Sequence, residues 1–87
     1  MRIVRHPRFD KSLQRLPKAV RRALADRLEL LLADSRHPLL NDHALAGEFR
    51  GLRSVNVTGD WRLIYGRVDA ATLLLVRIGT HHDLYGS

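Results

Sequence analysis

Histidine, arginine, acidic and aromatic residues collect in the second half of the chain, and their types suit one kind of chemistry. In RNA hydrolysis the RNA supplies the nucleophile, its 2′-hydroxyl, so a protein supplies a base, an acid for the leaving 5′-oxygen and cations for the phosphate. Histidine suits both proton transfers because its unperturbed pKa is about 6.5. Arginine suits the phosphate, and aromatic rings stack on unpaired bases. The polar and aromatic candidates for this chemistry are His43, Arg50, Arg53, Asn56, Asp60, Trp61, Arg62, Tyr65, Arg77, His81, His82, Asp83 and Tyr85. Such a set alone does not separate an RNA-cleaving site from the ordinary surface of a small basic protein.

The charge of the chain allows the same chemistry. Its formal net charge is +6, and thirteen of the fifteen basic residues are arginine. A planar guanidinium binds phosphate in a bidentate manner, whereas lysine offers a point charge. Two interpretations of this charge remain open: a polyanionic partner such as RNA or an acidic protein tail, or a charge that serves solubility alone.

The length and composition exclude several classes of protein. The 87 residues favour one domain, residues 1–87, whose core is too small to enclose a catalytic chamber, so we expect a shallow groove. The chain has no cysteine for disulfides or thiolate metal sites. It has no apolar run of about 18 residues, and its start lacks the apolar region of a signal peptide. We therefore expect a cytoplasmic protein with no membrane partner.

A metal site is not expected either. His81, His82 and Asp83 are adjacent on a short tail, and the sequence offers no matching cluster of ligands elsewhere. The chain also lacks P-loop, GxSxG, HExxH and CxxC motifs. We expect neither a metal nor a cofactor.

The first half of the chain has the periodicity of helices. Residues 1–5 could form a short edge strand, and Pro7 suits the first turn of a helix. A second helix should run from Pro17 to about Ser35, and the two should form a helical hairpin. Their apolar residues recur with helical spacing at Phe9, Leu13 and Leu16, and then at Val20, Leu24, Leu28 and Leu31.

The second half has the character of a β-sheet. Residues 38–48 have the composition of a loop, Gly79 should end the last strand, and residues 80–87 should form a polar tail. The expected strands are residues 49–57, 61–68 and 72–78. The predicted fold is therefore α+β, with the helical hairpin on one face of a small antiparallel sheet. The other face of such a sheet can stay exposed and could hold a substrate.

Three linked motifs resemble those of one known family. They read DHALAGEFRGLR at 42–53, GDWRLIY at 59–65 and RIGTHHDLYG at 77–86. In this order and spacing they resemble the YafQ branch of the RelE superfamily of bacterial toxins. That family folds as helices on a small antiparallel sheet and cleaves mRNA, often on the ribosome, without a metal.

The resemblance implies roles for individual residues. His43 matches the histidine of the family's HxLxG motif. Asp60 and Trp61 match its DW pair, which borders the active site. His81 matches the histidine of the GTH motif, the leading candidate for the general acid, and Tyr85 stands where the family has an aromatic residue.

One position departs from the family pattern. Asn56 occupies a place on the first main strand where the YafQ branch usually has a second histidine. Asparagine does not shuttle protons near neutral pH, although it can hydrogen-bond a phosphate or a 2′-hydroxyl. The general base is then either His43 or Asp60.

Three arginines are candidates for holding phosphates. Arg62, with Tyr65, resembles the RLxY of the wider RelE group, whose arginine contacts phosphate; Arg53 and Arg77 are the other two. Alternation along strands predicts that the three do not all share one face. The predicted protein is a metal-independent endoribonuclease whose partners are mRNA, the ribosome and a cognate antitoxin with an acidic or amphipathic segment.

Two other functions remain open on the same scaffold. The ParE branch of the superfamily has a similar fold but inhibits DNA gyrase and lacks the catalytic set, and the presence of His43, Asp60 and His81 argues against it. The third possibility is an RNA-binding module without cleavage. Cleavage of an mRNA in a translation extract separates the first function from both others.

Overall fold

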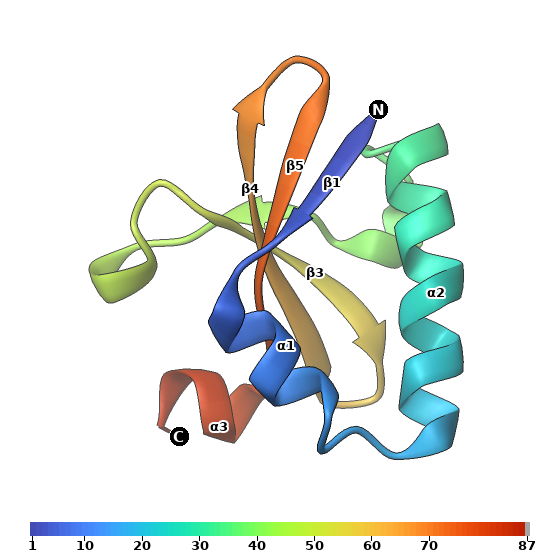
Figure 1. Cartoon of the computed structure of the whole chain (residues 1–87), viewed down its shortest axis with the longest axis vertical. Coiled ribbons are helices and arrows are strands. Elements are labelled where there is room, and N and C mark those ends of the chain that lie inside the picture. Colours follow the sequence, from blue (N-terminus) through green and yellow to red (C-terminus); the bar gives the residue numbers. More distant parts are fainter. Residues whose placement is uncertain (87) are drawn as a thin grey trace.

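A five-stranded sheet organises the chain in the computed structural model, which describes residues 1–86 (Figure 1). The strand order is β1-β5-β4-β3-β2; β1 runs parallel to β5 and every other neighbouring pair is antiparallel. The elements are β1 (Arg2–Arg5), α1 (Pro7–Leu13), α2 (Lys18–Ala33), β2 (His43–Ala44), β3 (Arg53–Thr58), β4 (Trp61–Asp69), β5 (Thr72–Thr80) and α3 (His81–Tyr85), with 3₁₀ turns at Pro38–Leu40 and Gly47–Phe49.

Helices α1 and α2 cover one face of the sheet, as predicted. α1 packs mainly against β5 and α2 mainly against β3, so the two helices spread across the sheet (Figure 1). The apolar stripe of α2 turns inward, and the Arg27 Nε donates a hydrogen bond to the Val57 carbonyl oxygen at 3.0 Å, which ties α2 to β3. The main core combines both layers, from Phe9, Val20, Leu24 and Leu31 on the helices to Val55, Leu63, Tyr65 and Leu75 on the strands. The predicted α+β class and the N-terminal edge strand are confirmed.

The loop before the sheet differs from the prediction. The strand expected at 49–57 begins only at Arg53, because Gly47 and Gly51 have φ of 66° and 89° and bend the chain there. Within the expected loop, His43–Ala44 pairs with β3 as a fifth strand. The candidate residue His43 therefore lies on the edge strand of the sheet.

The predicted polar tail is wrong for residues 81–85, which form helix α3. Thr80 begins the helix, since its hydroxyl accepts a hydrogen bond from the Asp83 N–H at 3.1 Å, and Gly86 ends it with a φ of 76°. Gly79 does not end β5. A Cβ there would lie 3.3 Å from the buried Leu84, so glycine lets α3 pack close to the strand. Ser87, the end of the expected tail, lies outside the described residues.

Between residues 1 and 86, no helix combines the length and the apolar character that crossing a membrane requires.

Candidate active site

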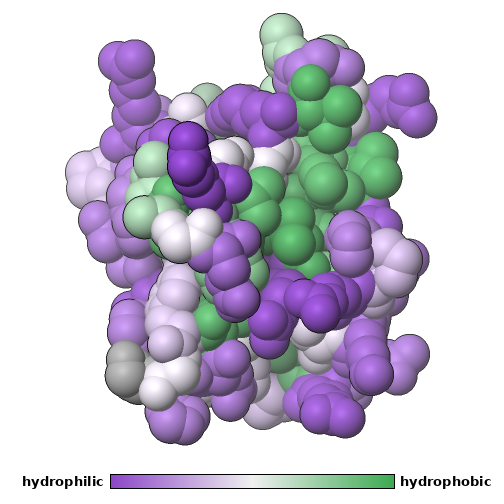
Figure 2. Space-filling model, turned by 90° about the vertical axis from the view of Figure 1, so that its left-hand side faces the viewer, coloured by the Kyte–Doolittle hydropathy of each residue, from purple (hydrophilic) through white to green (hydrophobic). Residues whose placement is uncertain are grey.

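The face of the sheet away from the helices, here called the open face, gathers several of the candidate residues. Neighbouring strands align Asn56, Arg62 and Gly79 in one row and place Ile64 beside Arg77 in the next. Residues between them face the main core, so these rows face the other way. Figure 2, viewed from the side away from α2, shows a hydrophobic area bordered by hydrophilic side chains. A second apolar cluster underlies this face: Phe49, Ile64 and Leu84, with Leu45, Leu52, Val76 and Tyr85 against them.

Helix α3 places His81 beside the β3–β4 turn. The backbone N–H of His81 donates to the Asp60 carbonyl oxygen at 2.9 Å, and Thr80 is the strand partner of Trp61. The exposed His81 ring meets Tyr85 edge-on, with ring centroids 4.7 Å apart. The fold therefore brings the second and third sequence motifs together at one end of the sheet.

His43 lies exposed on the edge strand β2, opposite Ser54 of β3. Its Nδ1 is 2.8 Å from the carbonyl oxygen of Asn41. A carbonyl oxygen can only accept, so Nδ1 carries the hydrogen in this contact. In the neutral ring Nε2 then has the free lone pair. This tautomer is the one that a general base acting through Nε2 requires.

Two arginines of the open face are held by local contacts. Arg62 Nη1 donates to the carbonyl oxygens of Gly59 at 2.8 Å and Trp61 at 3.0 Å, which fixes its guanidinium over the β3–β4 turn. The Arg77 guanidinium carbon lies 6.0 Å from the centroid of the Phe49 ring. A bulge in β5 lets Val76 and Arg77 both contact this face, where simple alternation would separate them.

The open face also holds polar atoms without protein partners. The Oδ1 of Asn56 and the hydroxyls of Ser54 and Tyr85 are buried and make no hydrogen bond with residues 1–86. Buried polar atoms in native proteins are almost always satisfied by protein, water or a ligand. The oxygens of Asn56 and Tyr85 are therefore left for water or a ligand, and their role as RNA contacts stays a prediction.

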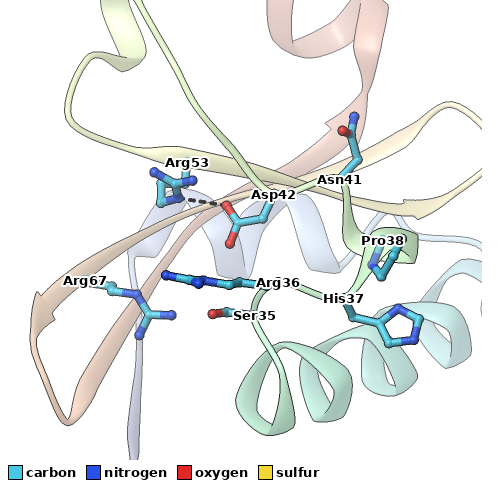
Figure 3. A pocket seen from close by; sticks show the side chains of 8 residues that line it. All are labelled: Ser35, Arg36, His37, Pro38, Asn41, Asp42, Arg53 and Arg67. Atoms are coloured by element: carbon cyan, nitrogen blue, oxygen red, sulfur yellow. Dashed lines mark hydrogen bonds and ion pairs between the residues drawn. The ribbon is translucent and has the colours of Figure 1, made fainter.

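Trp61 and Arg53 lie on the helix side of the sheet. The half-buried Trp61 packs against the main core, which limits the ring surface left for stacking on a base. Arg53 Nε donates to Asp42 Oδ1 at 2.7 Å, and this hydrogen bond raises the pKa of Arg53 (Figure 3). Arg53 therefore does not share a face with Arg62 and Arg77, as strand alternation predicts.

Asp42 belongs to the first sequence motif, but the motif assigns it no role. Its side chain is 9% exposed and accepts hydrogen bonds from Arg53 and from the hydroxyl of the buried Tyr65. Burial, and then the bond to Asp42, raise the pKa of Tyr65 to about 12. This cluster anchors the residue directly before His43. The sequence signal for this cluster is the acid directly before His43, together with Tyr65, a tyrosine at a strand position that faces the core.

The described residues do not include three His, Cys, Asp or Glu side chains grouped to hold a metal ion.

Comparison with solved structures defines the class of protein. The fold matches the RelB–RelE antitoxin–toxin complex from Methanococcus jannaschii with a TM-score of 0.72, covering 95% of each chain at 15% identity, a likeness of fold alone. It also matches the Escherichia coli DinJ–YafQ toxin–antitoxin complex with a TM-score of 0.73 at 30% identity, covering 97% of this chain and 96% of that one. The fold is that of the RelE-like toxins.

The family follows from the sequence. Residues 1–86 match the model of the family described as "Bacterial toxin of type II toxin-antitoxin system, YafQ", and the chain belongs to that family. It is 40% identical over 62 residues to the mRNA interferase toxin YafQ of Escherichia coli (strain K12). The match covers 68% of this chain and 66% of that relative. The resemblance stated from the three motifs is confirmed.

Proposed function

We propose that this chain is an endoribonuclease that cleaves mRNA without a metal. The observation that carries the proposal is the position of His81. It lies at the start of α3 beside Asp60, at the end of a sheet face that also presents Arg62 and Arg77. The name of the Escherichia coli relative, an mRNA interferase, supports the same activity.

The proposed reaction uses the RNA's own nucleophile. His43 Nε2 takes the proton of the 2′-hydroxyl, whose oxygen attacks the adjacent phosphorus. His81 gives a proton to the 5′-oxygen as the bond from phosphorus to that oxygen breaks. Arg62 and Arg77 stabilise the charge that builds on the phosphoryl oxygens. The products carry a 2′,3′-cyclic phosphate and a 5′-hydroxyl.

Of the two candidates for the base, the hydrogen bond from Nδ1 to Asn41 favours His43, because it frees Nε2. Asp60 then orients α3 through its carbonyl oxygen. The pH profile of cleavage distinguishes them. With His43 as the base, His43→Gln removes the acidic limb of the pH profile and Asp60→Asn keeps it; the reverse result assigns the base to Asp60.

The partners follow from the same face. We propose that mRNA is cut on the ribosome, in the cytoplasm, and that an antitoxin silences the toxin. The crystal structure of the Escherichia coli DinJ–YafQ toxin–antitoxin complex supports an antitoxin partner. Apolar residues and arginines together on the open face suit an amphipathic segment with acidic side chains.

The test is cleavage of an mRNA in a translation extract by the wild type, His81→Ala and His82→Ala. His82 is the matched control because it is the exposed histidine next in the same helix. We expect His81→Ala to lower the rate about 10²–10⁴-fold and His82→Ala to stay near wild type. Loss of cleavage from His82→Ala alone would overturn the assignment. A wild type that inhibits gyrase and leaves mRNA intact would favour the ParE-like alternative.

A further inference from the structure

The net positive charge of the chain comes from its first 22 residues, which precede the segment that holds the proposed active site. Residues 1–22 contain eight of the fifteen basic residues and one of the nine acidic ones, a net charge of +7. Residues 23–87 contain seven basic and eight acidic residues, a net charge of −1. Charge on the protein dominates its affinity for RNA backbones. The part of the chain that holds the proposed active site therefore has no net positive charge with which to attract its substrate.

Helix α1 carries part of this charge toward the active site. Arg8, Lys11 and Arg15 recur at i, i+3 and i+7, so α1 and the turn after it present them on one side. All three are exposed. They line a groove between α1, β5 and α3, whose other lining residues are Ser12, Arg77 and Asp83.

The cations of this groove, here called the α1 groove, have no acidic partners within the described residues. The ion pairs found across residues 1–86 are Arg5–Asp10 and Arg53–Asp42, and neither includes Arg8, Lys11, Arg15 or Arg77. The one carboxylate that lines the groove is Asp83. Gathering like charges disfavours the compact state, and a bound polyanion offsets that repulsion.

We propose that the α1 groove binds backbone phosphates of the RNA strand being cut. This proposal rests on the proposed function. Arg77 contacts the ring of Phe49 in the apolar cluster of the open face and also lines the groove, so it joins the two surfaces. Asp83 lies two residues after His81 in α3. RNA bound at His81 would continue between α1 and α3, and Arg8, Lys11 and Arg15 would hold phosphates beyond the cleaved bond.

The test measures binding separately from cleavage. In a His81→Ala background, a short fluorescein-labelled single-stranded RNA is titrated at several salt concentrations. The groove variant is Lys11→Gln with Arg15→Gln. The matched control is Lys18→Gln with Arg22→Gln, two exposed cations of α2 that do not line the groove and that give the same change in net charge. Glutamine keeps helix propensity, and circular dichroism checks folding.

Each phosphate contact on single-stranded nucleic acid contributes about 0.7 to the slope of log affinity against log salt. We expect the groove variant to lower the slope by about 1.4, which corresponds to about 25-fold weaker binding at 0.1 M salt. The control variant should change both the salt slope and the affinity much less. Equal effects of the two pairs would mean that net charge alone acts and would overturn the proposal.

Two further outcomes separate this proposal from the proposed function. If the wild-type chain binds RNA through the groove but does not cleave it, the proposal for the groove stands and the proposed endoribonuclease activity is wrong. A wild type that cleaves, with groove variants that bind RNA normally and lose only the antitoxin, would assign the groove to the protein partner and overturn the proposal.

Discussion

The buried contact between Tyr65 and Asp42 makes a prediction about stability. Tyr65 is 0% exposed and its hydroxyl donates to Asp42, whose side chain is 9% exposed. Tyr65→Phe removes the donor and leaves the acceptor buried, which costs about 1–3 kcal/mol. In a domain of this size each kcal/mol lowers Tm by about 4–8 °C. We expect a Tm at least about 4 °C lower, measured by thermal unfolding at pH 7.

The same contact has a defined pH dependence. Burial raises the pKa of Tyr65 to about 12 from the ordinary value of 10.0. Between these values the folded protein keeps a proton that the unfolded chain loses. The stabilisation is therefore complete below pH 10 and is lost as the pH rises toward 12. The stability gap between wild type and Tyr65→Phe should narrow across that window, as followed by urea unfolding with the fluorescence of Trp61, the single tryptophan.

Tyr85→Phe is the matched control. The Tyr85 hydroxyl is buried without a hydrogen-bond partner among residues 1–86, so its removal should leave stability equal or higher. A Tyr65→Phe protein as stable as the wild type at pH 7, or a gap that widens from pH 10 to 12, would refute the reasoning about Asp42.

Other substitutions test the site itself. Asn56→His restores a histidine on the strand that faces the proposed RNA site, and we expect equal or faster cleavage; a folded variant without cleavage would show that Asn56 has its own role. Leu84→Ala empties the buried anchor of α3, so we expect a loss of about 2–5 kcal/mol and slower cleavage, and unchanged cleavage would show that α3 need not be fixed. Arg77→Glu should weaken binding of both RNA and antitoxin in titrations, more at low salt; normal binding of both would remove Arg77 from the shared surface.

The layers of the fold could be predicted because their signals are local. Val20, Leu24 and Leu31 repeat with the helical period and are all buried in α2. The short runs of apolar residues between turns predicted the three main strands. Helix α3 was missed because five residues are too few to show a period and only Leu84 among them is buried. The capping residues Thr80 and Gly86 were the available signals.

The arrangement of the site depended on contacts that spacing does not encode. Alternation along the strands predicted that Arg53, Arg62 and Arg77 do not all share one face, but not that the partner of Arg53 is Asp42, which lies 11 residues away across a turn. The bulge that brings Arg77 to the open face has no marker in the sequence. The α1 groove could not be predicted because Arg77 and Asp83, which complete its lining, lie far along the sequence from Arg8, Lys11 and Arg15.

The most direct test of cleavage by the RNA's own hydroxyl replaces that hydroxyl. An mRNA with one 2′-deoxynucleotide on the 5′ side of the mapped cut is compared with the all-RNA form in a translation extract, and the new ends are sequenced. We expect no cut at the deoxy position, and 5′-hydroxyl ends from the all-RNA control. A cut that persists at the deoxy position and leaves a 5′-phosphate would contradict it, because water rather than the 2′-oxygen would then be the nucleophile.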